Sequence, residues 1–152
     1  MNFDYESLDK AFSLNTSGNG RCYYGATIGN KTYDGERNWD ERWSLLKDCI
    51  EYKNKNVVEI GCNMGICVAY LKKFSEINKA LGVDLPADLL IATNKRDTIK
   101  AARLLFKGLL IEDQIELLQI DLNNSQYENK IIATNYDIAI AFSIYKWIDD
   151  KP

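Results

Sequence analysis

Nine residues from Val57 to Gly65, Val-Val-Glu-Ile-Gly-Cys-Asn-Met-Gly, decide the fold of this chain. The run Val57–Ile60 is short and rich in β-branched residues, which is typical of a strand. Gly61 and Gly65 permit a tight turn and let a ligand approach the backbone closely. An apolar-periodic stretch follows at Ile66–Ile77, so the segment predicts a strand, a glycine turn and a helix. The N-terminus of such a helix suits a carboxylate or a phosphate.

The rest of the chain after this turn continues to alternate between strands and helices. Further strands are predicted at Ala80–Asp84, Ile115–Ile120 and Asp137–Phe142. A helix is predicted from Pro86, whose missing N–H has no partner at a first helical position, to Lys107. Strands that alternate with helices indicate an α/β, Rossmann-like parallel sheet of about four strands with helices on both faces.

The chain before the turn reads as two parts. Residues 1–38 form an N-terminal extension, in which segments 22–28 and 31–33 flank Gly29-Asn30 as a hairpin. A helix capped by Asn38 or Asp40 is predicted to run to about Tyr52. Its core-facing residues are predicted to be Trp39, Trp43, Leu46, Cys49 and Ile50. The hairpin tyrosines, which either form a lid over a site or serve as packing residues, are Tyr23, Tyr24 and Tyr33.

Two acids follow the second and third predicted strands. Asp84 ends the strand about 20 residues after the turn, and Asp121 ends the next one. Because open α/β sheets bind ligands at the carboxyl ends of their strands, we expect both acids and the turn to share one ligand site. Each feature also has a purely structural explanation: turn geometry for the glycines, a helix cap for Asp84 and an ordinary loop acid for Asp121. Their joint placement favours the ligand site.

The turn does not fit the dinucleotide pattern G-x-G-x-x-G, because Asn63 and Ile66 replace its second and third glycines. Residues Val57–Gly65, with Glu59 two positions before Gly61, instead resemble motif I of class I S-adenosylmethionine-dependent methyltransferases. The resemblance continues through segments 82–85, 119–122 and 136–143 and covers about residues 57–148. It implies S-adenosyl-L-methionine as the cofactor, and it makes residues 39–152 the N-terminal part of a methyltransferase domain.

The same resemblance implies roles for individual residues. The backbone from Gly61 through Cys62 and Asn63 to Gly65 would lie against the methionine part of the cofactor, with Glu59 ordering the loop. Asp84 would accept hydrogen bonds from the ribose hydroxyls. The residues that would surround the adenine are Leu85, Asp121 and Leu122, and those near the transferring methyl group would be Phe142 and Ser143.

The sequence does not identify a catalytic residue. Asp149, Asp150 or a tyrosine could serve as a base, although a solvated helix face is the simpler explanation of the two acids. Arg42 is either a surface arginine or a contact for the cofactor carboxylate or the acceptor. Since the family's sheet usually has seven strands, we expect either a fragment or a domain that another chain completes. A homodimer through the open sheet edge is one such arrangement.

The composition of the chain limits the classes of partner that it is expected to bind. A net charge of -3 gives no basic footprint for nucleic acid, so a small-molecule or glycan acceptor is favoured over RNA. No apolar run approaches the roughly 20 residues that span a bilayer, and the first residues do not resemble a secretory signal. The absence of histidine and of paired cysteine motifs argues against a metal site, and the four cysteines suit reduced thiols in the cytoplasm. The alternative functions are a nucleotide-binding oxidoreductase and a non-catalytic Rossmann-like interaction module.

Overall fold

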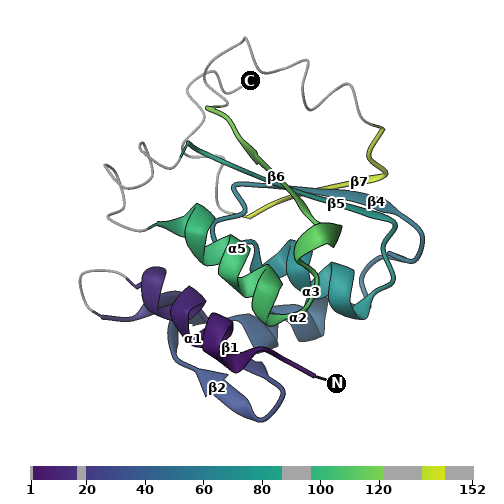
Figure 1. The fold of residues 1–152 in the computed structure, drawn as a ribbon. Coiled ribbons are helices and arrows are strands. Elements are labelled where there is room, and N and C mark those ends of the chain that lie inside the picture. The colour runs from purple at the N-terminus through teal and green to yellow at the C-terminus, as the bar shows by residue number, and fades with distance from the viewer. Residues whose placement is uncertain (1, 17–19, 87–96, 122–134, 143–152) are drawn as a thin grey trace.

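A computed structural model describes residues 2–16, 20–86, 97–121 and 135–142. Its central feature is a four-stranded, all-parallel sheet in the order β6-β5-β4-β7 (Figure 1). The strands are β4 (Asn56–Ile60), β5 (Lys79–Asp84), β6 (Glu116–Gln119) and β7 (Ile138–Ala141). The α/β class and the four parallel strands predicted from the sequence are therefore confirmed, with strand ends that differ by at most one residue.

The helices of the described residues lie on one side of this sheet (Figure 1). They are α1 (Tyr5–Leu14), α2 (Trp39–Leu46), α3 (Ile66–Phe74) and α5 (Thr98–Gly108), and a short 3-10 turn, η1 (Glu112–Gln114), precedes β6. Val57 of β4 belongs to the large core between the sheet and these helices. Its neighbour Val58 belongs to a smaller apolar cluster on the opposite face of the sheet. The second helical layer predicted for that face is not tested by the described residues and stays a prediction.

The N-terminal segment forms a small mixed sheet in the order β2-β1-β3. Its strands are β1 (Cys22–Ile28), β2 (Lys31–Tyr33) and β3 (Gly35–Asn38). β1 and β2 pair antiparallel, with Ile28 opposite Lys31, so the predicted hairpin is confirmed. β1 and β3 pair in parallel and approach so closely that a Cβ on Gly35 would lie 1.9 Å from the nitrogen of Gly25.

The N-terminal elements share the core of the parallel sheet. Helix α1, which the sequence patterns did not predict, packs on α5, where a Cβ on Gly108 would lie 2.5 Å from the side chain of Leu8. The amide of Asp4 donates to the carbonyl of Gly108 at 2.9 Å. Leu8 and Phe12 of α1 belong to the same buried cluster as Val57. The division of the chain at residue 38 stays a prediction.

Two helices end earlier than predicted. α2 starts after its cap Asn38, one of the two predicted caps, but it ends at Leu46 instead of about Tyr52. Ile50 is therefore half exposed, not in the core, and Cys49 is exposed as well. α3 ends at Phe74, not at Ile77, because Glu76 adopts a left-handed φ of 51° that reverses the chain toward β5.

The prediction of one continuous helix from Pro86 to Lys107 is wrong, because Asp97 has non-helical backbone angles, with φ -90° and ψ 73°. α5 begins at Thr98, and Asp97 is its N-cap: the carboxylate accepts a hydrogen bond from the amide of Lys100 at 3.1 Å. An aspartate favours this position because its side chain satisfies one of the free amides of the first turn. Residues 87–96 lie outside the described part of the chain.

The sheet has two edge strands within the described residues, β6 and β7. The predicted homodimer would use such an edge, and it stays a prediction. None of the helices that the structure describes is both long and apolar enough to cross a bilayer.

Replacing Asp97 with Ala tests where α5 begins. At an N-cap the substitution should lower the free energy of unfolding by about 1 kcal/mol, because the Lys100 amide loses its acceptor. In the interior of one long helix the same change would be stabilising, since alanine has the better propensity. Urea unfolding measures the difference, with Lys100→Ala, an exposed position in the same helix, as the control.

Candidate functional site

The glycine turn and one of the predicted acids, Asp84, meet at the carboxyl ends of the strands. In the register of the strands, Ile60 lies opposite Val83 on one side and Ala141 on the other. Gly61, the next residue along β4, is therefore level with Asp84 and Phe142. This carboxyl edge, made by Gly61–Gly65, Asp84 and Phe142, is called the rim below.

The turn folds over the end of the neighbouring strand β5. The amides of Gly61 and Cys62 both donate to the carbonyl of Val83, at 2.8 and 3.0 Å. Gly61 and Gly65 have left-handed φ values of 71° and 68°, which glycine adopts without strain. A Cβ on Gly65 would also lie 2.8 Å from the ring of Phe106. Both conformation and space therefore require glycine at Gly65.

Asn63, in the middle of the turn, has a left-handed φ of 54°. Asparagine tolerates this region better than most residues other than glycine, which explains how it can stand at the second position of the pattern. Its side-chain oxygen accepts a hydrogen bond from the amide of Met64 at 2.8 Å, and its own amide donates to the carboxylate of Asp84. The turn is thus tied to the acid at the end of β5.

Asp84 is half-buried, and its carboxylate faces the glycine turn. One oxygen accepts from the amide of Asn63, and the other accepts from the amide of Leu85 at 2.8 Å. Burial raises the pKa of Asp84, and the two amide hydrogen bonds act in the opposite direction. A carboxylate has about four acceptor positions, so two remain for a ligand.

Glu59 is the buried acid of the turn, with 4% of its surface exposed. It lies on β4, and its carboxylate accepts from the amide of Val68 in the first turn of α3 at 3.1 Å. The N-cap of this helix is Gly65, which has no side chain, so the strand supplies the capping oxygen. Burial raises the pKa of Glu59 to about 8; the charge of Asp84 adds to the rise, whereas the Val68 amide and the charge of Arg42 oppose it.

The thiols beside the turn pack in the core. Cys62 fills the space next to Gly82, where a Cβ would lie 3.0 Å from its sulfur. Burial raises the pKa of the Cys62 and Cys67 thiols well above the usual range, which disfavours the reactive thiolate. Neither is suited to be a nucleophile. Among the described residues, no group of three or more His, Cys, Asp or Glu side chains could hold a metal ion.

A cation on α2 lies beside the rim. The guanidinium of Arg42 is 4.7 Å from the centre of the Phe142 ring, and it donates to the hydroxyl of Tyr24. Arg42 is half-buried and lowers the pKa of Glu59 by its charge. The sequence raised Arg42 and Tyr24 separately; no spacing along the chain indicated that they would meet each other at Phe142.

The remaining predicted site residues are less closely grouped. Leu85 and Asp121 are both half-buried, and Asp121 follows Ile120, whose amide donates to the carbonyl of Asp84 at 2.9 Å. Asp121 is thus near the end of β5 through its backbone. The predicted positions outside the described residues are Leu122, Ser143, Asp149 and Asp150.

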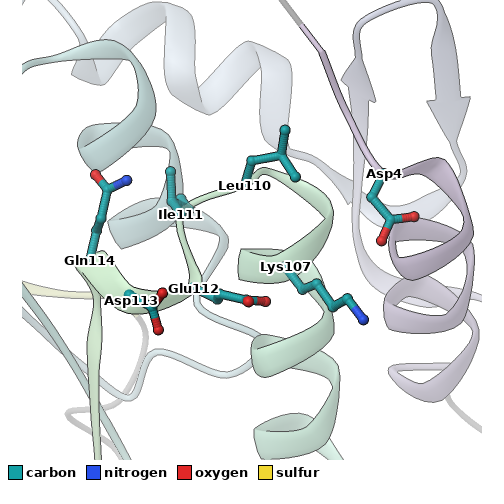
Figure 2. A pocket seen from close by; sticks show the side chains of 7 residues that line it. All are labelled: Asp4, Lys107, Leu110, Ile111, Glu112, Asp113 and Gln114. Atoms are coloured by element: carbon teal, nitrogen blue, oxygen red, sulfur yellow. The ribbon is translucent and has the colours of Figure 1, made fainter.

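Two surface hollows of about 300 Å³ lie away from these residues. Figure 2 shows one of them, with the side chains of Lys107 and Glu112 projecting beside the loop before β6. Because that loop enters β6 at its amino end, the hollow lies at the edge of the sheet opposite the rim. The other lies between α1 and the hairpin, and Asp9, Phe12 and Tyr33 are part of its lining.

A scan against protein-family models gives no match, and a search of curated proteins finds no relative. Among solved structures, the chain is similar to PKMT2 from Rickettsia typhi in complex with AdoHcy, with 18% sequence identity and a TM-score of 0.45. The likeness covers 63% of this chain and 16% of PKMT2, so the chain spans only a small part of the length of that protein. At that score the likeness does not decide what this chain binds.

The buried Glu59 should make stability depend on pH. Its pKa is about 8 in the folded chain and near 4.5 when unfolded, so the folded state holds the proton more tightly between these values. Stability should therefore be highest below pH 4.5 as far as this group is concerned, and should fall as the pH rises toward 8. From about pH 5.5 to about pH 7.5 we expect a loss of about 2 kcal/mol.

Glu59→Gln removes this titration and keeps an oxygen for the Val68 amide. Urea unfolding of the variant should show a shallower decline with pH than the wild type over the same interval. Glu112→Gln, at an exposed glutamate, is the matched control and should follow the wild type. Parallel pH profiles for wild type and Glu59→Gln would contradict the assignment.

Proposed function

We propose that the rim binds S-adenosylmethionine and that the chain is the cofactor-binding part of a methyltransferase. The observation that carries the proposal is the contact between the amide of Asn63 and the carboxylate of Asp84. It joins a left-handed turn to an acid at the carboxyl edge of a parallel sheet, which is where open α/β folds bind ligands.

The groups at the rim fit an adenosine-bearing cofactor. The carboxylate of Asp84 keeps about two further acceptor positions, which is enough to accept one hydrogen bond from each of two ribose hydroxyls. The α3 N-terminus begins immediately after Gly65 and carries a partial positive charge, which suits the carboxylate of the methionine part. The backbone of residues 61–65 would lie against that part of the cofactor, and Glu59 would hold the helix start in place.

The other contacts are proposed from the resemblance of the sequence. Leu85, Asp121 and Leu122 would surround the adenine, and Phe142 would lie near the reacting group. Arg42, which contacts Phe142, would supply positive charge to the cofactor carboxylate or to the acceptor.

The cofactor supplies an electrophilic methyl group on its sulfonium. The protein's part is to orient the cofactor and the acceptor, for which no metal is required. We propose a small molecule or a glycan as the acceptor; the acidic charge balance weighs against RNA.

A dinucleotide-binding oxidoreductase is less well supported. Ile66 stands where that pattern has its third glycine, and its side chain is buried in α3 with 1% of its surface exposed. An interaction module that binds no cofactor is the other alternative. Isothermal titration with S-adenosylhomocysteine and with NAD separates the three: the first ligand, the second ligand or neither should bind.

Asp84→Ala tests the role of the acid. If Asp84 holds the ribose, the variant should bind S-adenosylhomocysteine more weakly by about 1–3 kcal/mol, because the hydroxyls lose their acceptor. Asp113→Ala, in the hollow at the opposite edge, is the control and should bind as the wild type does. Thermal unfolding of both variants establishes that they are folded, and an unchanged affinity in folded Asp84→Ala would refute the role.

A further inference from the structure

Asn15, at the end of α1, makes a buried contact with the glycine turn. It is the C-cap of α1 and has 0% of its surface exposed. Its side-chain nitrogen donates to the side-chain oxygen of Asn63 at 2.9 Å, across 48 positions of sequence. The same nitrogen lies 3.5 Å from the sulfur of Cys22.

The contact continues through the turn to the acid of the rim. The Asn63 oxygen that accepts from Asn15 also accepts from the amide of Met64, and the Asn63 amide donates to Asp84. With its φ in the left-handed region, Asn63 presents its side-chain oxygen to Asn15 and its amide to Asp84 at the same time. The hydrogen bond from Asn15 therefore influences the conformation in which the Asn63 amide donates to Asp84.

The orientation of the Asn15 amide follows from its partner. The Asn63 oxygen already accepts from a backbone N–H, so it faces Asn15 as an acceptor and requires a donor there. The nitrogen of Asn15 must point to the turn, and its oxygen then points elsewhere.

That oxygen is buried and has no hydrogen-bond partner among the described residues. Burying an unsatisfied carbonyl is unfavourable, and an apolar side chain of similar size would avoid the cost. A residue that served packing alone would not need the amide. Its use at this position is explained by the hydrogen bond that it gives to the turn.

We propose that Asn15 is a positioning residue for the cofactor site and that α1 is consequently a working part of that site. The inference rests on the proposed function for its binding consequence, but not for the contact itself. It places the end of α1 behind the turn, where it holds Asn63 in the conformation that presents the Asn63 amide to Asp84.

The first test uses the full chain without ligand. In Asn15→Leu, which has similar volume and no donor, hydrogen exchange of the Asn63 and Met64 amides should be about tenfold faster once global stability is taken into account. Leu8→Ala, at a fully buried position of the same helix, is the control and should leave both amides at the wild-type rate after the same correction. Unchanged exchange in Asn15→Leu would overturn the proposal.

The second test separates positioning from packing. Asn15→Leu should bind S-adenosylhomocysteine about tenfold more weakly while its urea midpoint stays at or above the wild-type value, because the unsatisfied oxygen is gone. Leu8→Ala should lower the midpoint and leave the affinity unchanged. A lower urea midpoint together with wild-type affinity in Asn15→Leu would contradict the positioning role of Asn15.

The two failures can be told apart. If the wild type binds no S-adenosylhomocysteine, the proposed function fails, and the exchange experiment still decides whether Asn15 positions the turn. In the double variant Asn15→Leu/Asn63→Ala, the Met64 amide should exchange no faster than in Asn63→Ala alone, since both substitutions act through the side-chain oxygen of Asn63. Additive effects would overturn the coupling.

Discussion

The alignment of the carboxyl ends of β4 and β5 is the constraint on which the rest of the structure depends. Because Ile60 pairs with Val83, the chain that leaves β4 must cross over the end of β5 to reach α3. The Val83 carbonyl accepts the amides of both Gly61 and Cys62, which forces the turn into left-handed geometry. The rim takes its shape from this crossing, and Asp84 is the residue that the crossing places in front of the turn.

Two acids are held at this crossing in different ways. Glu59 is buried beneath the turn and caps α3 from the strand; burial raises its pKa, whereas the capping hydrogen bond opposes the rise. Asp84 is half-buried, receives two backbone amides and retains capacity for further donors. The buried Glu59 stabilises the start of α3, and the half-buried Asp84 is the acid that a ligand could reach. The charge of Asp84 adds to the rise in the pKa of Glu59, because like charges repel at close range.

The N-terminal segment is built into this arrangement. α1 packs on α5, and α5 in turn supplies Phe106, whose ring occupies the space that a side chain on Gly65 would need. The glycine turn therefore packs on α5, which is the helix that α1 contacts. Arg42 reaches the other end of the rim at Phe142, so N-terminal residues contact the rim from two directions.

The sequence by itself determined the strands, their parallel direction and the position of the turn. Those features depend on local signals: the β-branched run at Val57–Ile60, the glycines at the turn, and acids directly after strands. Helix ends were predicted less well, since the reversal at Glu76 and the exposure of Ile50 depend on where the chain must turn to pack. The capping aspartate Asp97 was missed although it stands in a polar run, Thr93–Thr98, that interrupts the apolar positions on either side.

Only the tertiary structure decided which side chains meet at the rim. Arg42 with Phe142, and Asn15 with Asn63, are joined across long stretches of sequence, and no periodicity relates the members of either pair. Such contacts arise when separate elements pack on a common core, because each side chain then takes whatever partner the neighbouring element presents. Local patterns carry the elements and their order, whereas the pairing of polar groups at the site follows from the packing.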